Sequence, residues 1–252
     1  MRSQPQMLNL QRALVEAIPA HPLLMKLEQH GTLPTADRDL LSRMLTDIRT
    51  FEGRRDIIRV GEDPEFVHLM IEGWACRYSI VDDGQRQITA FLIPGDFCDA
   101  HITMLGRMDH SIGALGRARV AFVSKDLMRE VAERPALTRA LWWASLVDEG
   151  VLRAWLVNMG RRDAYDRVAH LICELEVRLQ SVGVGAGDRF ELPLTQEDLG
   201  DALGLSPVHV NRVLRRLREQ NLMTISNKTL TILNPSELRR QSGFGGEYLH
   251  LN

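Results

Sequence analysis

The spacing of apolar residues divides the chain into a helical beginning, a β-rich middle and a helical end. Apolar residues recur at helical spacing over residues 8–41, with a break at Pro22 and a capping hydroxyl at Thr35. Residues 49–124 instead form short β-rich runs: DIIRV, FVHLMIEGWACRYSIV, ITAFLIPGDF and RARVAFVS. Turn sequences such as the one at Asp82, Asp83 and Gly84 separate these runs. Several short strands with even turn spacing predict a small antiparallel barrel or jelly roll.

A long apolar stretch follows, beginning at Pro135 and ending at Gly160. Its apolar residues cover so much of the helix circumference that more than one neighbour must bury them. One stripe alternates by three and four residues, as the seam of a coiled coil does: Ala140, Trp143, Val147, Val151 and Ala154. Packing within one core would also satisfy this stripe. We expect a parallel helix pair from two copies of the chain, with an imperfect seam at Asp148 and Gly150.

Residues 192–218 carry the signals of two short helices joined by a tight turn. Thr195 offers a capping hydroxyl and is followed by acidic residues, which a helix N-terminus favours. Gly204 suits a left-handed C-terminal turn, Ser206 offers a second cap, and Pro207 fits the first helical position. The sequence therefore predicts a helix-turn-helix whose second helix spans residues 207–219.

The second of these helices has one apolar stripe and one polar face. The stripe consists of Val210, Val213, Leu214 and Leu217, and the opposite face carries Val208, His209, Asn211, Arg212, Arg215 and Arg216. The following residues, LMTISNKTLTIL, alternate around Asn227 and Lys228 and predict a β-hairpin. A helix pair with such a hairpin is a winged helix, so we expect the polar face to enter the major groove of double-stranded DNA. Plain packing with a solvated arginine face is the alternative.

The whole-chain composition narrows the class of protein. The chain has 252 residues, 44% hydrophobic and 25% charged, which is typical of a globular protein of one or two domains. A formal net charge of −2 supplies no global basic field, so affinity for DNA must come from a local patch. No apolar run is long enough for a membrane span, and the N-terminus lacks the apolar core of a signal peptide. We therefore expect a cytoplasmic protein without a membrane partner.

Residues that could carry chemistry are scattered along the chain. The three cysteines are far apart and in no CxxC pattern, and we expect buried thiols: Cys76, Cys98 and Cys173. The sequence contains no nucleophile elbow, phosphate-binding loop, dinucleotide fingerprint or metal-ligand pair, so we predict that the chain is not an enzyme. His101 and His110, with Asp99 and Asp109, raise the question of a metal site, but their spacing matches no ligand motif. We therefore predict no metal.

Two long segments resemble a known family. The sequence LTQEDLGDALGLSPVHVNRVLRRLREQNLM is similar to the DNA-binding domain of the Crp/Fnr family of bacterial transcription regulators, and IEGWACRYSIVDDGQRQITAFLIPGDF resembles the β-roll of cyclic-nucleotide-binding domains. The resemblance implies an α+β fold with an N-terminal antiparallel β-roll or jelly-roll sensor domain, a long dimerisation helix and a C-terminal winged helix-turn-helix. We expect N-terminal helices and β-roll in residues 1–134, the dimerisation helix in 135–161, the DNA-binding domain in 162–238 and a tail in 239–252.

The resemblance also implies how DNA is bound. In the family, a homodimer places the second helix of each copy in the major groove of two half-sites related by a twofold axis. By position, the residues that face the bases are Pro207, Val208, Asn211 and Arg212, and those near phosphates are Ser206, His209 and Arg215. Well-studied members carry a glutamate at the position of Val208. Valine can contact only a thymine methyl, so we expect a different half-site, with Arg212 bonding O6 and N7 of a guanine.

The ligand cassette of the β-roll departs from the family pattern. Nucleotide-binding members supply a helix turn and an arginine for the cyclic phosphate and a carboxylate for the ribose. Matched over the cassette CDAHITMLGRMDHSI, this chain has Asp99 and Ala100 at the glycine and glutamate positions, and His110 at the arginine, and it keeps Ser111. The sequence therefore argues against binding of cyclic AMP. Protonated His110 can pair with an anion, so both a different ligand and a ligand-free regulatory domain remain open.

The other sensors of the family also lack support, and we identify no cofactor. Residues 1–47 contain no cysteine, which argues against an N-terminal iron–sulfur cluster. The resemblance implies contact with RNA polymerase at residues 82–85 and 181–188, and regulation by rotation of the DNA-binding domains at Gly160. The alternative function is a ligand-binding module of the cyclic-nucleotide type, or a scaffold, without sequence-specific DNA binding.

Overall fold

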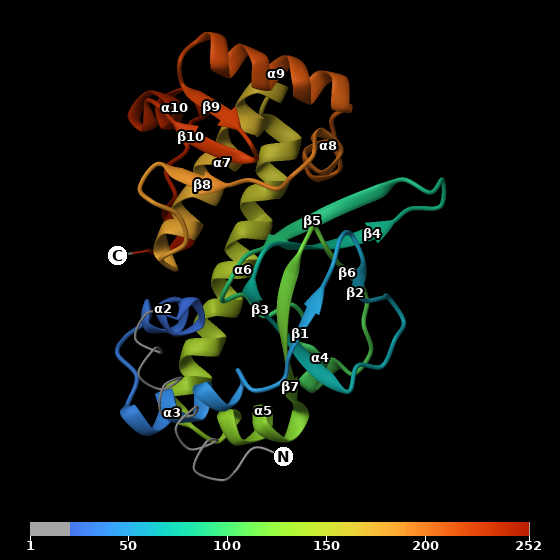
Figure 1. The fold of residues 1–252 in the computed structure, drawn as a ribbon, viewed down its shortest axis with the longest axis vertical. Coiled ribbons are helices and arrows are strands. Elements are labelled where there is room, and N and C mark those ends of the chain that lie inside the picture. Colours follow the sequence, from blue (N-terminus) through green and yellow to red (C-terminus); the bar gives the residue numbers. More distant parts are fainter. Residues whose placement is uncertain (1–20, 252) are drawn as a thin grey trace.

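One long helix, α6 (Pro135–Arg161), connects the two ends of the molecule (Figure 1). The computed structural model describes residues 21–251; the predicted helical pattern over residues 8–20 lies outside this range. A β-roll and two short helices surround the first half of α6, and a second bundle of helices with a small sheet surrounds its end. The predicted α+β fold is therefore confirmed.

The β-roll consists of two antiparallel sheets, with strand orders β1-β7-β3 and β2-β6-β4-β5. The strands are β1 (Ile48–Phe51), β2 (Asp56–Ile58), β3 (Phe66–Glu72), β4 (Ala75–Ile80), β5 (Arg86–Leu92), β6 (Ser111–Ala114) and β7 (Ala118–Ser124). Each predicted run contains at least one strand, whereas the four-residue strands β1 and β6 are too short to be recognised by alternation. The connection at Gly73 passes from one sheet to the other. Glycine is required there, because φ is 78° and a Cβ would lie 2.3 Å from the Arg117 carbonyl oxygen.

Four of the described helices pack around the β-roll. These are α2 (Pro22–Glu28), α3 (Thr35–Arg43), α4 (Ile102–Leu105) and α5 (Lys125–Ala132). Two of them, α2 and α5, contact α6. Helix α3 begins at Thr35 itself, with Pro34 rather than Thr35 at the capping position. The core enclosed by these elements contains Leu27, Met70 and Leu137, which are all completely buried. This core anchors the first half of α6.

The predicted seam of α6 is only partly available to a second copy of the chain. Ala140 and Val151 are buried within the protomer, and Trp143, Val147 and Ala154 are half-buried. A different stripe is exposed on α6: Trp142, Leu146, Leu152, Leu156 and Val157. Periodicity identifies apolar positions on a helix but cannot assign them to one of two neighbours, which is why the predicted stripe differs from the exposed one.

The second bundle has the predicted winged-helix order. It contains α7 (Ala164–Ser181), β8 (Arg189–Glu191), α8 (Gln196–Leu203), α9 (Pro207–Glu219), β9 (Met223–Ser226), β10 (Thr229–Ile232), α10 (Pro235–Ser242) and the 3₁₀ turn η2 (Glu247–Leu249). The hairpin turns at Asn227 and Lys228, whose φ values are 49° and 59°. Strand β8 directly follows the predicted loop of residues 181–188. It joins the hairpin to form a three-stranded sheet with the order β8-β10-β9. Helix α10 continues past residue 238, where we expected the tail to begin.

The C-terminal segment docks on α6. The carbonyl oxygen of Tyr248 would lie 3.0 Å from a Cβ at Gly150, so the small residue permits the close approach. Leu249 is buried in the second core together with Trp155 of α6. Across the described residues, we find no helix that is both long and apolar enough to cross a membrane.

Candidate nucleic-acid interface

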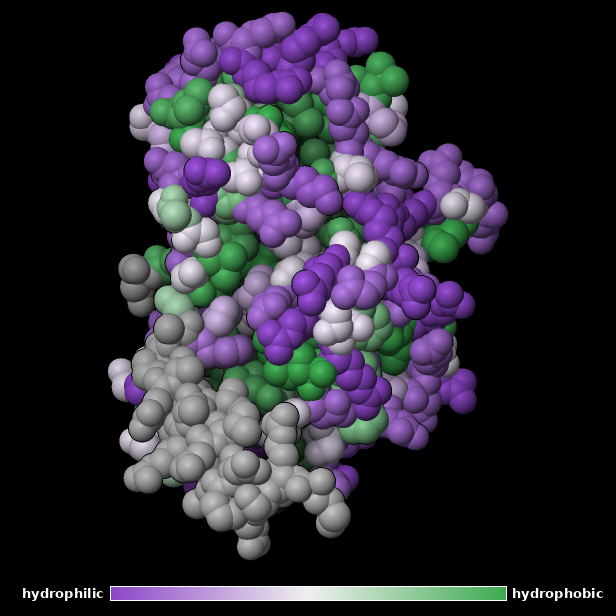
Figure 2. Space-filling view, in the orientation of Figure 1, coloured by the Kyte–Doolittle hydropathy of each residue, from purple (hydrophilic) through white to green (hydrophobic). Residues whose placement is uncertain are grey.

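Helix α9 presents a polar face to solvent because its apolar residues all lie on the other side. Val210 and Leu217 are completely buried, whereas Val208 is 71% exposed. At about 100° per residue, Val208, Arg212 and Arg215 lie opposite the centre of the buried stripe. The surface over α9, at the top of Figure 2, is predominantly hydrophilic. All seven residues predicted to contact DNA are exposed: Ser206, Pro207, Val208, His209, Asn211, Arg212 and Arg215.

The arginines of α9 differ in whether their side chains already contact other residues of the chain. Arg216 is exposed, as the sequence predicts, but its guanidinium also lies 4.5 Å from the ring centre of Tyr165 on α7, and this contact helps to fix α9 to the bundle. Arg215 pairs with Glu219 at 3.7 Å. Arg212 makes no hydrogen bond or ion pair with any residue in the range 21–251. Its five N–H donors are therefore available to a base.

The N-terminus of α9 is organised as the sequence predicts. Ser206 caps the helix, and its Oγ accepts a hydrogen bond from the backbone N–H of His209 at 3.3 Å. Pro207 occupies the first turn. The preceding helix α8 has a capping box of Thr195 and Asp198 and ends at Gly204, whose φ is 62°. These local signals hold the two helices in the arrangement that exposes the polar face of α9.

Helix α8 is bound to the β-roll of the same chain by a buried carboxylate. Both oxygens of Asp198 accept hydrogen bonds from the Arg54 guanidinium at 2.7 Å, and Arg86 at the start of β5 donates to the same carboxylate at 2.9 Å. Arg86 also pairs with Asp201 at 2.7 Å. Burial opposes ionisation, but the hydrogen bonds from Arg54 and Thr195 outweigh it and lower the pKa of Asp198 to about 2. Asp198 is therefore ionised in the physiological pH range, so its ion pairs with Arg54 and Arg86 link α8 to the β-roll there.

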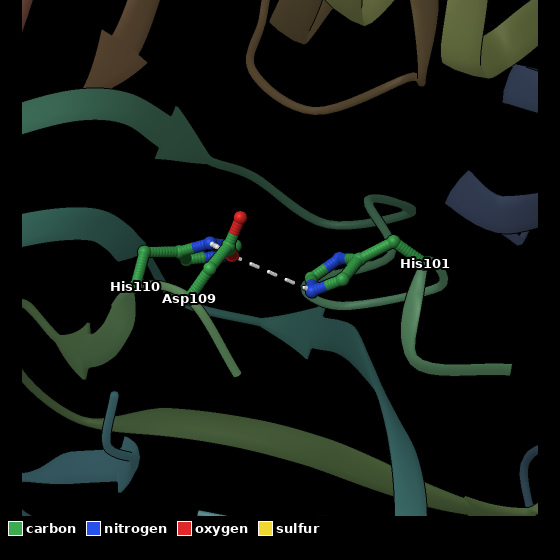
Figure 3. Close-up of side chains that lie close together, drawn as sticks. All are labelled: His101, Asp109 and His110. Carbon is green, nitrogen blue, oxygen red and sulfur yellow. Dashed lines mark hydrogen bonds and ion pairs between the residues drawn. The ribbon is translucent and has the colours of Figure 1, made fainter. Parts of the chain in front are cut away.

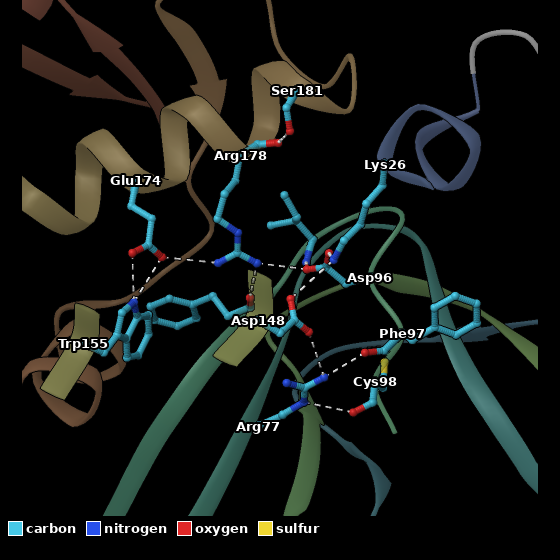
Figure 4. Close-up of polar contacts among 12 residues, drawn as sticks. Lys26, Arg77, Asp96, Phe97, Cys98, Asp148, Trp155, Glu174, Arg178 and Ser181 are labelled. Carbon is cyan, nitrogen blue, oxygen red and sulfur yellow. Dashed lines mark hydrogen bonds and ion pairs between the residues drawn. The ribbon is translucent and has the colours of Figure 1, made fainter. Parts of the chain in front are cut away.

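A second link between the two ends of the molecule is a set of buried and half-buried charges, here called the interdomain charge cluster (Figure 4). It contains three cations and three anions: Lys26, Arg77, Arg178, Asp96, Asp148 and Glu174. Asp96 of the β-roll pairs with Lys26 of α2 at 2.6 Å and with Arg178 of α7 at 3.0 Å. Burial opposes ionisation of Asp96, but these two cations lower the pKa of its carboxyl.

The interdomain charge cluster also reaches α6 and the C-terminal segment. Asp148 lies 3.5 Å from Lys26 and 3.6 Å from Arg77. Glu174 is completely buried and accepts hydrogen bonds from the Trp155 indole N–H at 3.0 Å and from the Tyr248 hydroxyl at 2.8 Å. Burial raises the pKa of Glu174. The sequence did not reveal this cluster, because its members are brought together only by the tertiary fold.

A cavity of about 470 Å³ lies between the β-roll and α6, next to this cluster. Residues of β4, β5, α6 and α7 line it, and they include Arg77, Asp148 and Arg178. His110 and its neighbour Asp109 line the same cavity. Burial lowers the pKa of His110, although the hydrogen bond to Asp109 opposes the shift. Of the four predicted pocket residues, His110 is thus the one at the cavity wall.

The other three predicted pocket residues lie away from the cavity. The Asp99 carboxylate is completely buried and accepts from the His68 backbone N–H at 2.7 Å, with the His68 imidazole at 2.5 Å. Its negative charge is therefore directed at His68. Ser111 Oγ accepts from the Val60 N–H at 3.0 Å, and Ala100 packs against the β-roll core.

Comparison with known proteins gives matches to both ends of the chain. Residues 48–134 match the family of cyclic nucleotide-binding domains, and residues 166–241 match the Crp-like helix-turn-helix domain family. The nitrogen fixation regulation protein FixK of Bradyrhizobium diazoefficiens is 31% identical over 170 residues, which cover 67% of this chain and 70% of FixK. The fumarate and nitrate reduction regulatory protein of Vibrio cholerae is 22% identical over 217 residues, covering 86% of each chain.

The fold is also similar to solved structures. The structure of FixK2 from Bradyrhizobium japonicum superimposes with a TM-score of 0.69 at 24% sequence identity, covering 77% of this chain and 95% of FixK2. The transcriptional regulator TTHB099 from Thermus thermophilus has a TM-score of 0.63 at 17% identity, covering 77% of this chain and 96% of its own.

Proposed function

Because the chain belongs to the Crp/Fnr family of DNA-binding transcription regulators, we propose that it binds a palindromic operator as a homodimer through α9 of each copy. The observation that carries the proposal is the exposed face of α9, on which Arg212 has no partner among the described residues. A twofold pair of such helices fits half-sites one helical turn apart, about 10 base pairs from centre to centre.

The exposed apolar stripe of α6 supports the homodimer. Its members are between 46% and 66% exposed: Trp142, Leu146, Leu152, Leu156 and Val157. An apolar stripe along one long helix is what a twofold helix pair buries, and the same stripe from the second copy is its natural partner. The pairing would bring together two α9 helices at one end of the dimer, since α6 leads into the DNA-binding domain.

Base recognition in this proposal depends mainly on Arg212 and Asn211. Arg212 bonds O6 and N7 of one guanine, which discriminates by about 1–3 kcal/mol against another base. Asn211 can pair with adenine, and Val208, at the centre of the face, contacts a thymine methyl. Pro207 packs against the bases at the helix start.

Phosphate contacts supply the remainder of the affinity. Ser206 and His209 lie at the N-terminal end of the exposed face and Arg215 lies in its C-terminal half, so these side chains can reach phosphates that flank the contacted bases. The positive end of the α9 dipole adds to this attraction. These contacts carry no sequence information, so they are distinguishable from those of Arg212 by their response to salt.

The test is binding to a selected operator and to all single-base variants of it, over a range of salt concentrations. Arg212→Ala is expected to abolish the preference at one guanine, whereas Arg215→Ala weakens all sequences and lowers the salt slope by about 1. Arg129→Ala, on α5 of the β-roll, is the matched arginine control and should change neither property. Unchanged base preference in Arg212→Ala would refute the assignment, and failure to select any palindrome would refute the proposed function in favour of a module without DNA recognition.

The β-roll is proposed to regulate this binding. Its cavity is lined from both ends of the molecule, by Arg77 of β4 and by Arg178 of α7, so its contents can bias how the DNA-binding domain is docked. RNA polymerase is the proposed further partner, through the exposed turn at residues 82–85. DNA binding with and without cyclic nucleotides tests the first statement, and transcription in vitro by variants of this turn tests the second.

A further inference from the structure

Two histidines and one aspartate meet at the β-roll cavity, although they come from different elements (Figure 3). His101 immediately precedes α4, and Asp109 and His110 immediately precede β6. One nitrogen of each imidazole and one carboxylate oxygen of Asp109 lie within 4.8 Å of one another. Oδ1 of Asp109 is 2.6 Å from Nδ1 of His110 and 3.7 Å from Nε2 of His101. The imidazole rings are 5.2 Å apart between centres.

The ring nitrogens of this group are incompletely used. Nε2 of His101, the nitrogen that faces Asp109, is inaccessible to solvent and has no hydrogen-bond partner among the described residues; the same is true of Nε2 of His110, at the ring edge away from Nδ1. A buried polar atom that is left unsatisfied is destabilising, so such atoms commonly mark a site for a missing ligand. Both rings turn toward the same carboxylate, as Figure 3 shows.

We propose that His101, Asp109 and His110 bind a divalent transition-metal ion such as Zn²⁺, Fe²⁺ or Co²⁺. Two imidazoles and one carboxylate form a ligand set that these ions accept, with open positions left for water or another ligand. Water or another ligand can reach the site, because Asp109 and His110 line the cavity and the Asp109 side chain is 76% exposed. The proposal is independent of how the chain binds DNA.

The observed separations suit such an ion after small side-chain movements. Ligand bonds of about 2.0–2.2 Å place neighbouring ligand atoms about 3 Å apart. The two distances from Asp109, 2.6 Å and 3.7 Å, lie on either side of this value. His101 can make the adjustment because the following helix α4 is a single turn ending at Gly106, whose φ is 85°.

The site should also discriminate against Mg²⁺ and Ca²⁺, and a neighbouring arginine is paired with an aspartate. Mg²⁺ and Ca²⁺ prefer oxygen ligands, so a site with two imidazoles discriminates against them. Arg77, which lines the same cavity, is offset by Asp148 at 3.6 Å and donates to the carbonyl oxygens of Phe97 and Cys98. The sequence predicted no metal because seven residues, including all of α4, separate His101 from Asp109.

The experiment is metal titration of the full chain after removal of bound metal by a chelator. Co²⁺ is the optical probe, Zn²⁺ the competitor and Mg²⁺ the negative probe. We expect one Co²⁺ per chain with visible absorption bands, displacement by Zn²⁺, and no displacement by Mg²⁺. His101→Gln, Asp109→Asn and His110→Gln should each weaken binding by about 100-fold or more, as loss of a ligand or its support does.

His250→Asn is the matched control, because His250 is an exposed histidine far along the chain from the site and should leave binding unchanged. Histidine-labelled nuclear magnetic resonance of the unmodified protein guards against misfolded variants, since Zn²⁺ should shift two of the eight histidine ring signals. The proposal is overturned if Co²⁺ and Zn²⁺ do not bind stoichiometrically, if binding survives all three substitutions, or if neither ring signal moves.

Discussion

Leu156→Asp is the sharpest perturbation of the proposed dimer. Leu156 is 65% exposed and lies toward the C-terminal end of the apolar stripe of α6. Complete burial of a leucine contributes about 1.5–3 kcal/mol, so burying the exposed two-thirds contributes about 1–2 kcal/mol per copy and about 2–4 kcal/mol per twofold dimer. Loss of this burial weakens dimerisation by about 30- to 700-fold, and the carboxylates brought into the seam weaken it further.

Analytical ultracentrifugation over a concentration series measures this effect directly. The unmodified chain should sediment as a dimer at concentrations at which Leu156→Asp is a monomer, and the variant should also lose the advantage of a two-half-site operator over a single half-site. Leu233→Asp is the control, since Leu233 is a half-exposed leucine that follows β10 instead of lying on α6. A Leu156→Asp protein that dimerises as tightly as the parent would refute burial of this stripe.

Three further predictions concern specificity, docking and the C-terminal segment. Val208→Glu should select a half-site with a cytosine or adenine that the parent does not require, and sequencing of selected duplexes checks this. Because the pKa of Asp198 is lowered to about 2, its contribution to stability is complete above the ordinary value of 3.8 and is lost as the pH falls toward 2. Arg54→Ala should raise that pKa, so hydrogen exchange of α8 should increase already near pH 4, and identical pH profiles would contradict the docking role. Tyr248→Phe removes a hydrogen bond to buried Glu174 and should lower the free energy of unfolding in urea by about 1–2 kcal/mol.

Local signals explain why so much of the DNA-binding domain is predictable from the sequence. Thr195, Gly204 and Ser206 each act within a few residues, and the hairpin turn at Asn227 likewise needs no distant partner. The long helix is equally evident from its apolar content. The stripe expected in the helix pair is partly buried within the protomer, because the burial of one face depends on which other elements pack against it.

Contacts between distant segments explain what the sequence could not provide. Arg54 lies 144 residues from Asp198, and Arg178 lies 82 residues from Asp96, so no motif records either pair. His101 and His110 are close along the chain, but their meeting depends on the path of α4 between them. The seven predicted DNA contacts and the ligand role of His110 stay predictions.

The carboxylate of Asp198 belongs to two structures at once, since it closes the capping box of α8 and receives Arg54 and Arg86 from the β-roll. A substitution of Asp198 would thus remove both the cap of α8 and the contact with the β-roll, and the phenotype of such a mutant would not show which loss caused it. Substitutions of Arg54 or Arg86 separate the two effects, because they remove the contact with the β-roll and leave the cap of α8 intact. Substitutions that weaken docking alone should accordingly be found at Arg54 and Arg86, while Asp198 is also required by the cap of the helix.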